Sequence, residues 1–508
     1  MSDRLARNAL YLTAASVGQK ILSFVYFLLL ARVLQPEKTG QYSIALALVT
    51  TFYVVSDLGI PSVIIREVAR APGQALPLVR RALAFKIPTT LLALLLANLT
   101  AWLLGYESAA RWLVLFSGGT LALDSFSVFF YGVLRGKHVL AYESVGMFVG
   151  QAITLAFGAA VLFVHPSLPL LIVILILGSL FNFLFSAGQA IRRLGWAAAR
   201  PAWSMAGFRQ IFGLSLPFFL AAAFVKLFST LDVQFLKFFW GNAAVGVYSV
   251  AYKFTYAFQF LPLAFVAALY PGMSALVGER DQAGLTDLFE QAVRYMLLLS
   301  VPLAFGLAFI AQEAVRLVGA SYAAAVPVLS FLPFVLIPSF LDFPVGSLLN
   351  AAGRQNAQTA LFGATLGVNF LLDLWLVPAY GMVGAAAGSI ASVTLLALGG
   401  FLYVPRVIRG YRLRRLWRLA LPVVAAGVAM RLAAHGLRVG LPSVLPSPHP
   451  ALAVIVAGSV LVYVAALFAT RALRRRDVAA LARLVRRAPR AAEPAEVVEK
   501  WSGDAGER

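Results

Sequence analysis

Cysteine is absent from this chain of 508 residues, and histidine and charged residues are scarce. Without cysteine the protein has no disulfide, no thiol nucleophile and no thiolate metal site. The four histidines are scattered, with no two at the spacing of metal ligands, so we expect no histidine metal site: His138, His165, His435 and His449. Only 12% of the residues are charged, whereas soluble domains have about 25%, which excludes an ordinary soluble protein.

Long apolar runs take the place of the missing charge. Hydrophobic residues make up 61% of the chain, and runs such as 87–104 and 168–185 are almost uninterrupted. Because about 20 apolar residues are enough to cross a bilayer, such runs predict membrane-spanning helices. We predict an all-α polytopic membrane protein with about fourteen transmembrane helices, near residues 9–34, 41–65, 82–104, 110–134, 141–164, 168–190, 210–240, 244–277, 291–312, 325–350, 357–377, 383–405, 416–436 and 451–470.

The placement of the basic residues predicts how these helices cross the membrane. The net charge of +21 invites a nucleic-acid partner, but most of the 42 Lys and Arg fall at one side of the predicted membrane. Only five fall at the opposite side: Lys38, Arg111, Arg316, Arg431 and Arg438. Basic residues gather on the cytoplasmic side, so we predict a multi-pass protein of the plasma (inner) membrane with both termini cytoplasmic. We expect no nucleic-acid partner, and we expect the N-terminus to begin a retained helix because no cleavage site follows it.

An internal repeat relates the two halves of the chain. When the sequence is shifted by 206 residues, 16–43 lies over 222–249, and Lys20 falls on Lys226. The Gly-x-Tyr-Ser motif that begins at Gly40 recurs in the second copy. Six helices in each copy give both copies the same orientation, which places a substrate site at their interface.

The repeat predicts the domain organisation. Residues 1–200 and 201–410 form two six-helix lobes, and residues 411–470 supply helices 13 and 14 outside the repeat. The remaining segment, 471–508, starts as a basic amphipathic stretch that we expect on the cytoplasmic leaflet, and it ends in a polar, disordered tail.

The stretch ARVLQPEKTGQYSIALALVTTFYVVSDLGIPSVIIREVAR (31–70) resembles the Wzx-type polysaccharide and O-antigen flippases of the MOP superfamily, which also holds lipid II flippases and MATE multidrug extruders. The residues that carry the resemblance are Gly40, Tyr42, Ser43, Asp57, Leu58, Gly59, Arg66 and Glu67. The resemblance implies a V-shaped pair of lobes that moves undecaprenyl-pyrophosphate-linked oligosaccharide outward by alternating access. The implied partners are that lipid-linked oligosaccharide, membrane lipids and polysaccharide-assembly proteins.

Lysines lie deep in two of the predicted helices, at repeat-equivalent positions. A charge inside a bilayer is costly and is a functional candidate by default, so we predict that Lys20 and Lys226 line a cationic cavity for a pyrophosphate. The alternative is that they reach the interface or pair with an acid across the bundle. Further residues would extend the surface that binds substrate: Lys253, Arg32, Tyr252 and Tyr256.

Two acids predict a separate cation site. Asp232 lies about 120° around its helix from Lys226, at a depth similar to that of Asp373 and Ser389. Asn369, four residues before Asp373, shares its face, so carboxylates, an amide and a hydroxyl form an oxygen-rich site. The set resembles the sodium site of lipid II flippases, which implies Na+ or H+ coupling without an organic cofactor. Thr394 is the alternative hydroxyl, and the structural alternative is that an acid neutralises a lysine of the other lobe.

The remaining charged residues are candidates for a gate or for packing between lobes. Asp124 and Asp342 occupy corresponding places in the repeat, each followed by an arginine, Arg135 or Arg354. Asp57 and Arg66 lie at the inner end of the second helix, where Asp57 would cap and shape that end.

Three rival functions remain. A membrane glycosyltransferase or polymerase needs an acidic metal motif or a long outer loop, and the sequence has neither, so we expect no enzyme. A drug–cation antiporter of the same fold usually has twelve helices, so the fourteen predicted here count against that function. A scaffold without transport would have no use for deep charges.

Overall fold

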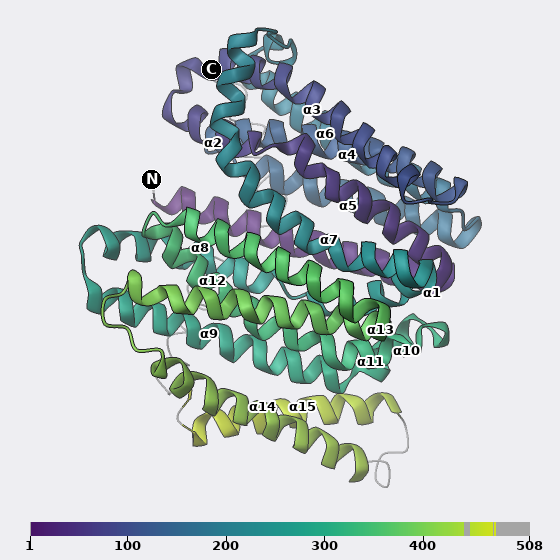
Figure 1. The fold of residues 1–508 in the computed structure, drawn as a ribbon, viewed down its shortest axis with the longest axis vertical. Helices are drawn as coiled ribbons and strands as arrows, with labels where there is room; N and C mark the ends of the chain where they lie inside the picture. Colours follow the sequence, from purple (N-terminus) through teal and green to yellow (C-terminus); the bar gives the residue numbers. More distant parts are fainter. Residues whose placement is uncertain (1, 441–447, 471, 474–508) are drawn as a thin grey trace. The chain divides into compact units, whose positions relative to one another are not determined.

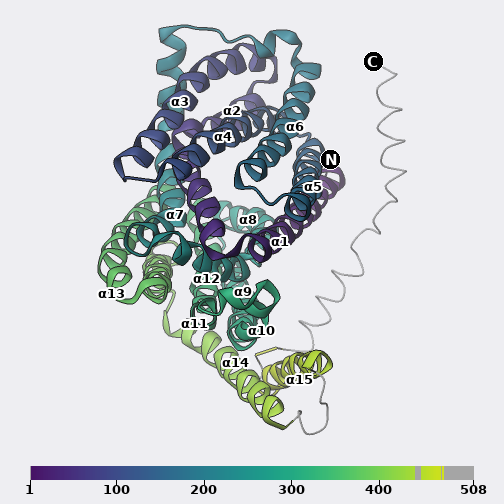
Figure 2. The same ribbon diagram turned by 90° about the vertical axis from the view of Figure 1, so that its right-hand side faces the viewer.

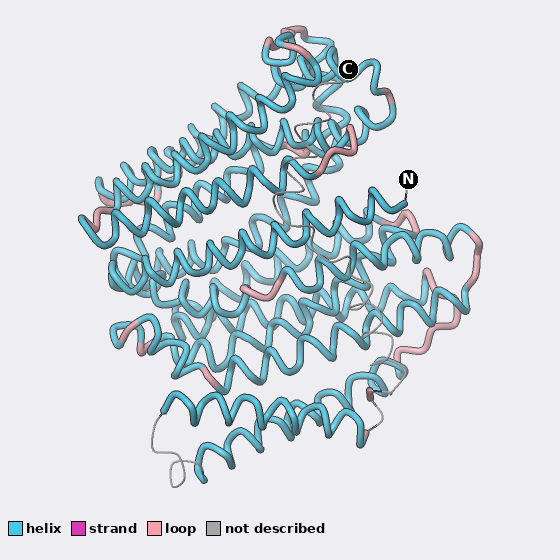
Figure 3. The backbone as a smooth tube through the Cα atoms, turned by 180° about the vertical axis from the view of Figure 1, so that it is seen from behind, coloured by secondary structure: helices cyan, strands magenta, loops and turns pink. Residues whose placement is uncertain are grey.

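The protein is described by a computed structural model in which residues 2–440, 448–470 and 472–473 are placed. Within these ranges the chain forms α-helices joined by short loops and 3-10 turns, with no β-strand (Figure 3). The helices are α1 (Ser2–Asp57), α2 (Ile60–Arg70), α3 (Ala75–Leu103), α4 (Ser108–Gly136), α5 (Ala141–Val164), α6 (Leu168–Leu194), α7 (Met205–Tyr256), α8 (Phe260–Gly278), α9 (Gln282–Phe309), α10 (Ala311–Val318), α11 (Ala325–Phe331), α12 (Leu336–Ala351), α13 (Gln355–Tyr403), α14 (Arg414–Gly440) and α15 (Pro448–Ala469).

Eleven stretches of the described residues are long and apolar enough to cross a membrane. Three of them, with 56, 46 and 52 residues, are each long enough for two crossings. Counting each of these three twice gives the fourteen crossings expected from run length. The predicted all-α polytopic membrane fold is therefore confirmed.

A residue with positive φ interrupts each of the three long helices. These residues are Gln35 (φ 65°), Gly241 (φ 79°) and Gly381 (φ 57°). Left-handed backbone is costly for residues other than glycine, and Pro36 after Gln35 supplies no N–H to continue the helix. The chain therefore folds back at these points, and we call the end of the bundle where they lie the break end. The other end, which holds the loops around residues 71–74, 137–140, 195–204, 279–281 and 352–354, is called the loop end.

Tryptophans mark both ends of the bundle. Seven are described, and each exposes between 52% and 78% of its surface near a helix end or a break: Trp102, Trp112, Trp196, Trp203, Trp240, Trp375 and Trp417. Amphipathic indole rings concentrate at membrane–water interfaces. This pattern, together with exposed leucines such as Leu91 and Leu95 between the ends, is that of a multi-pass membrane protein.

Each half of the unit 1–416 forms its own helix bundle. In the first half α1 packs against α3, α4 and α5, and α4 packs against α6. In the second half α12 packs against α8, α9 and α13, as Figures 1 and 2 show. Helices α1 and α7 pack along each other, and one apolar cluster, including Ile44 and Tyr248, runs through both halves.

The two halves meet at the break end through a reciprocal backbone contact. A Cβ atom on Gly40 would lie 1.8 Å from the carbonyl oxygen of Asn242, and one on Gly246 would lie 2.0 Å from that of Pro36. The shift of 206 residues turns Gly40 into Gly246 and Pro36 into Asn242, so the same contact is made twice. Only glycine permits this approach.

Tyr322, between α10 and α11, adds side-chain bonds to the same region. Its hydroxyl donates to the carbonyl of Ala31 at 2.9 Å and is bonded to the Thr39 hydroxyl at 2.8 Å. Burial raises the pKa of Tyr322 to about 12, which keeps the hydroxyl protonated and able to donate. The side-chain amide of Asn242 donates to Glu37 at 2.6 Å.

Residues 417–508 form a second compact unit. Its described part consists of α15 and most of α14, with Gly458 packed against Leu437. The predicted tail, 471–508, lies outside the described residues apart from positions 472 and 473.

Candidate functional site

The break in α13 brings two acids and their polar neighbours together with α7. Asn369 and Asp373 precede the break at Gly381, and Ser389 follows it, so the fold-back places all three near Asp232. The hydroxyl groups of Ser389 and Tyr248 both donate to Asp232 Oδ2, at 2.5 Å and 2.7 Å. We call this group the carboxylate cluster: Asp232, Tyr248, Asn369, Asp373 and Ser389.

The carboxylate cluster is buried and its bonding is incomplete. Asp232 is 6% exposed, and Asn369 and Asp373 are fully buried. Asp232 Oδ1, both carboxylate oxygens of Asp373 and both side-chain atoms of Asn369 have no hydrogen-bond partner within the described chain. A Cβ atom on Gly388 would lie 2.7 Å from Asp373 Oδ1, so glycine lets the two arms of α13 approach there. Buried polar atoms normally have partners, so these open oxygens fit a small cation of the sodium class.

Thr394, the alternative hydroxyl, does not join the carboxylate cluster. Its Oγ1 donates to the carbonyl of Ile390 in its own helix at 2.6 Å. Neither Asp232 nor Asp373 forms an ion pair with a lysine among the described residues. The structural alternative, in which one of these acids neutralises a lysine of the other lobe, therefore has no ion pair to support it there. Those residues also contain no group of three or more His, Cys, Asp or Glu that could hold a metal ion.

Three lysines lie near one another, one on α1 and one on each arm of α7, before and after the break at Gly241. Lys20 is close enough to Lys226 and Lys253 for its charge to act on both. Lys20 is exposed, and the other two are half-buried. Within the described chain none of the three has a carboxylate within ion-pair distance. We call Lys20, Lys226 and Lys253 the lysine cluster.

Aromatic rings accompany the lysine cluster. The ammonium of Lys226 lies 5.7 Å from the ring centre of Tyr53, and that of Lys253 lies 5.3 Å from the ring centre of Phe27. Such cation–π contacts stabilise an ammonium without neutralising it. The rings of the half-buried Tyr252 and Tyr256 are tilted by 40°, with their centres 4.3 Å apart, and pack against the apolar cluster that joins the halves.

The predicted gate residues have other neighbours. Arg135 forms a two-bond ion pair with Glu143, across the turn between α4 and α5, and therefore does not depend on Asp124. Asp124 lies beside Ser179 of α6 in the same half.

Four further candidates form no ion pair with one another among the described residues: Arg32, Arg66, Asp342 and Arg354. Arg66 is paired with Glu67 at 2.8 Å and lies 5.5 Å from the Phe218 ring of α7. Arg354 and Arg32 are exposed, and Asp342 has no ion pair among the described residues.

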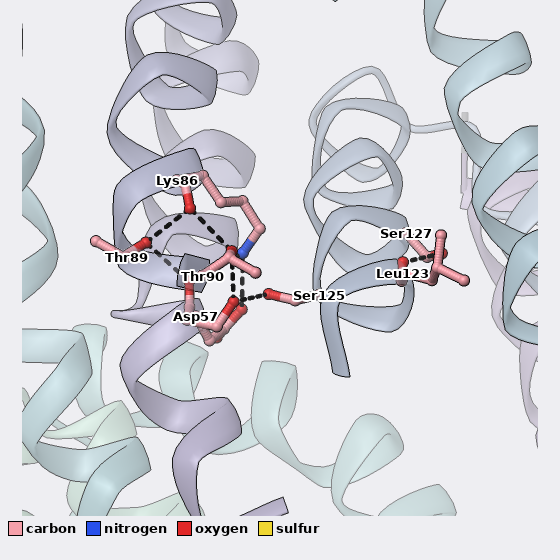
Figure 4. Close-up of polar contacts among 8 residues, drawn as sticks. Asp57, Lys86, Thr89, Thr90, Leu123, Ser125 and Ser127 are labelled. Carbon is pink, nitrogen blue, oxygen red and sulfur yellow. Dashed lines mark hydrogen bonds and ion pairs between the residues drawn. The ribbon is translucent and has the colours of Figure 1, made fainter. Parts of the chain in front are cut away.

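Asp57 closes α1 at a polar cluster that the sequence analysis did not predict. Leu58 (φ 43°) and Gly59 (φ 72°) interrupt the helix after Asp57, which leaves the carbonyl of Ser56 without its helical donor. The fully buried Lys86 donates to that carbonyl at 3.2 Å and pairs with Asp57 at 3.8 Å (Figure 4). A lysine at a helix C-terminus also complements the helix dipole.

Hydroxyl groups complete this Lys86 cluster, which we define as Ser56, Asp57, Lys86, Thr89, Thr90 and Ser125. Ser56 Oγ is bonded to Thr90 at 2.7 Å and to Ser125 at 2.6 Å. Thr89 donates to the Ser56 carbonyl at 3.3 Å. Asp57 therefore caps its helix through Lys86, and its side chain is 19% exposed.

Two functional candidates were missed for different reasons. Lys86 begins an apolar run, where a lysine usually marks the interface, and its partners Ser56 and Asp57 lie 30 and 29 residues away. Tyr248 is part of the repeat motif, and the shift of 206 residues places it over Tyr42. The same shift places Asp232 over Tyr26, so the second copy has a carboxylate where the first has a phenol.

Comparison with known proteins identifies the chain's relatives. A family model described as polysaccharide biosynthesis protein matches residues 5–277, more than half of the chain, and a MatE model matches residues 217–375. The chain is 25% identical to the probable flippase AglR of Haloferax volcanii, over 36% of this chain and only 39% of AglR. It is 22% identical to the probable low-salt glycan biosynthesis flippase Agl15 of the same organism, over 76% of this chain and 81% of Agl15.

The fold is similar to that of solved transporters. The lipid II flippase MurJ in its inward closed conformation matches with a TM-score of 0.70 at 14% identity, over 90% of this chain and 97% of that chain. At this identity the likeness concerns the fold alone.

Proposed function

Because the chain belongs to the polysaccharide biosynthesis protein family, within the MOP superfamily of transporters, we propose that it is a flippase for polyprenyl-pyrophosphate-linked oligosaccharide. It would move this lipid from the cytoplasmic to the outer leaflet of the plasma (inner) membrane, for the assembly of a cell-surface polysaccharide. Both termini would be cytoplasmic, which makes the loop end cytoplasmic and the break end external. Membrane lipids and polysaccharide-assembly proteins are its expected partners.

The observation that carries the proposal is the lysine cluster. Three lysines with no carboxylate of the described chain within ion-pair distance, two of them half-buried, lie where α1 of one half meets α7 of the other. The charge of Asp57 also acts on Lys226, from beyond that distance. Unpaired charge inside a membrane protein is costly, so it needs a compensating ligand. An anionic ligand supplies that compensation, and a pyrophosphate offers several oxygens to ammonium donors. The same charge would repel a cationic drug.

The carboxylate cluster supplies a means of coupling. A Na+ ion or a proton would satisfy the open oxygens of Asp232 and Asp373 and hold α7 against α13. Asp232 and Lys226 are six residues apart on one rigid helix, so a movement of α7 changes both clusters together. Thr230 of α7 is bonded to Thr51 of α1 at 2.8 Å, which links that movement to the other half.

The reciprocal glycine contact suits alternating access. It joins the halves at the break end, so an outward-open state requires Gly40 and Gly246 to separate from their partners. A contact made of backbone atoms from two helix breaks can part without exposing a large apolar surface.

A translocation assay in proteoliposomes tests the function. Purified protein would receive undecaprenyl-pyrophosphate-linked oligosaccharide, with and without an inward-directed Na+ or H+ gradient. We expect translocation by the wild type and at least a tenfold loss in Lys226→Ala, since one charged contact to phosphate contributes about 1.5–3 kcal/mol. Lys237→Ala is the matched control, because Lys237 lies on the same helix beside Tyr106, outside the lysine cluster.

The same assay separates the rival function. The MatE match supports a drug–cation antiporter as the rival function. A cationic dye would therefore be offered to the same vesicles. Transport of the dye without translocation of the lipid would contradict the flippase.

A further inference from the structure

A cavity of about 590 Å³ opens toward the loop end between helices of the two halves. Its volume falls within the usual range of ligand sites, about 300–1,000 Å³. Ser62 comes from α2 of the first half, and the other lining residues come from the second half: Phe218, Ala221, Val225, Asn350, Gln355, Asn356, Gln358, Thr359 and Phe362.

The lining of this cavity is polar and carries no charge. Four side chains end in amides, two end in hydroxyls and two are phenylalanines. No hydrogen bond is found for the side-chain amides of Asn350, Gln355 or Asn356 in the described part of the chain, so they are available to a ligand. Amides both donate and accept, as the hydroxyl groups of a sugar do, and apolar ring faces pack on the CH faces of sugars.

A neighbouring cavity at the same end has the opposite chemistry. It has a volume of about 570 Å³, and four arginines line it: Arg280, Arg354, Arg406 and Arg409. The loop end as a whole is therefore not poor in charge, and only the residues that line the first cavity are uncharged. Anionic groups would select the arginine cavity, and neutral polyhydroxylated groups would select the amide cavity.

The amide cavity lies next to the lysine cluster along α7. Phe218, Ala221 and Val225 share one face of that helix, and Lys226 follows directly after Val225. Phe218 and Lys226 are about 12 Å apart along the helix axis, at ~1.5 Å per residue. If the pyrophosphate of a ligand lies at Lys226, the part of the ligand that extends toward the loop end therefore reaches the cavity.

We propose that this amide cavity binds neutral sugar residues of the lipid-linked oligosaccharide and selects lipids by their sugars. The inference rests on the proposed function, because it assigns the sugar part of the same substrate. A bound sugar would contact both halves of the protein. Its binding would therefore favour the state described here, in which the cavity is open at the loop end.

The first test compares two substrates in the proteoliposome assay: a polyprenyl pyrophosphate with a neutral oligosaccharide, and the same lipid with a single sugar. The double variant Gln355→Ala/Asn356→Ala removes two exposed amides and leaves the helix intact. We expect about a tenfold loss for the oligosaccharide lipid and less than a twofold change for the single-sugar lipid, since two hydrogen bonds are lost. Asn98→Ala is the matched control, because this amide lies on α3 outside the cavity and donates to the Leu94 carbonyl in its own helix.

The second test measures binding without transport. A Gln355→Cys variant carries the only thiol in the chain, so maleimide labelling reports on this cavity alone. We expect the oligosaccharide lipid to slow labelling at least threefold and bare polyprenyl pyrophosphate to leave it unchanged.

The outcomes separate the two proposals. Protection without translocation by the wild type would overturn the flippase and leave the sugar site standing. Translocation with equal losses for both lipids in the double variant, or without protection, would overturn the sugar site and leave the flippase standing. A wild type that neither translocates nor is protected overturns both.

Discussion

The two halves of the molecule place different side chains at one equivalent position. In the first half Tyr26 and Tyr42 are packed in an apolar cluster with leucines of α5 and α6. In the second half the shift of 206 residues puts Asp232 and Tyr248 at these positions, and the tyrosine hydroxyl donates to the carboxylate. The surrounding backbone is alike, since both helices break at Gln35 or Gly241 and both carry the contact glycines.

The comparison teaches which buried charges have a structural role. In the first half the fully buried Lys86 donates to the Ser56 carbonyl and pairs with the carboxylate of Asp57 at 3.8 Å. The carboxylates of the second half, Asp232 and Asp373, keep oxygens without partners. The ammonium of Lys86 thus holds a helix end in place, whereas we propose that the open oxygens of Asp232 and Asp373 bind and release an ion.

The largest effect is expected from removing the carboxylate of Asp232, which stands where the first half has Tyr26. Asp232→Asn should lower gradient-driven translocation more than tenfold and abolish stabilisation by the coupling ion. At a Na+ concentration 100 times Kd the wild type would gain about 2.7 kcal/mol, measured as a rise in the temperature of unfolding. Tyr26→Phe, at the equivalent position, should keep both properties. A Na+-dependent rise that survives in Asp232→Asn would exclude the carboxylate cluster as the Na+ site, and a pH gradient would then test H+.

The second prediction uses the symmetry of the contact glycines. Gly40→Ala and Gly246→Ala each push a methyl group into a backbone carbonyl, so each should destabilise the protein by about 1–3 kcal/mol in thermal unfolding. Gly213→Ala is the control, since a Cβ there meets no atom within 4 Å. Unequal losses in the two glycine variants would show that the halves do not contribute equally to the contact.

The third prediction concerns the charge of the first half. Lys86→Met preserves side-chain length but removes the donor to Ser56 and the partner of Asp57, so we expect a loss of about 1–2 kcal/mol in stability. The response to Na+ should be unchanged. A lost response with normal stability would contradict the structural role assigned to Lys86.

The smallest effect distinguishes the two hydroxyl candidates near the acids. Ser389→Ala removes a bond to Asp232 and should weaken the affinity for the coupling ion three- to tenfold, which is about 0.5–1.5 kcal/mol. Thr394→Val removes only a bond within its own helix and should leave the affinity within twofold. Ion titrations of thermal stability measure both, and equal values would remove Ser389 from the site.

The fold was largely predictable because a bilayer imposes simple rules on a sequence. Apolar run length predicted the crossings, including those that fold back at Gly241 and Gly381, since a helix of about 50 residues exceeds the membrane thickness. The break at Gln35 follows from the adjacent Pro36. The amphipathic α10 and the contact of Tyr322 with Ala31 were not predictable, because they depend on tertiary packing between distant segments.

The candidate site was predictable only in part. Equal depth along helices was enough to group Asp232 with Asp373 and Ser389, because depth follows from residue count. Ion pairs across a turn could not be predicted from depth. Arg135 is an example, since its partner Glu143 lies eight residues away on the next helix. The amide cavity draws on residues from 62 to 362, and no local pattern marks such a surface.

The equivalence of Tyr26 and Asp232 also has a genetic meaning. Tyrosine and aspartate codons differ by a single base, so two copies of a duplicated segment can diverge at this position in one mutational step. The twin copy retains the unaltered packing throughout, so one gene can test an ionisable group inside a membrane without risking both halves of its product. Duplication followed by point substitution thus offers a short evolutionary route by which a carboxylate enters one half of a repeated bundle.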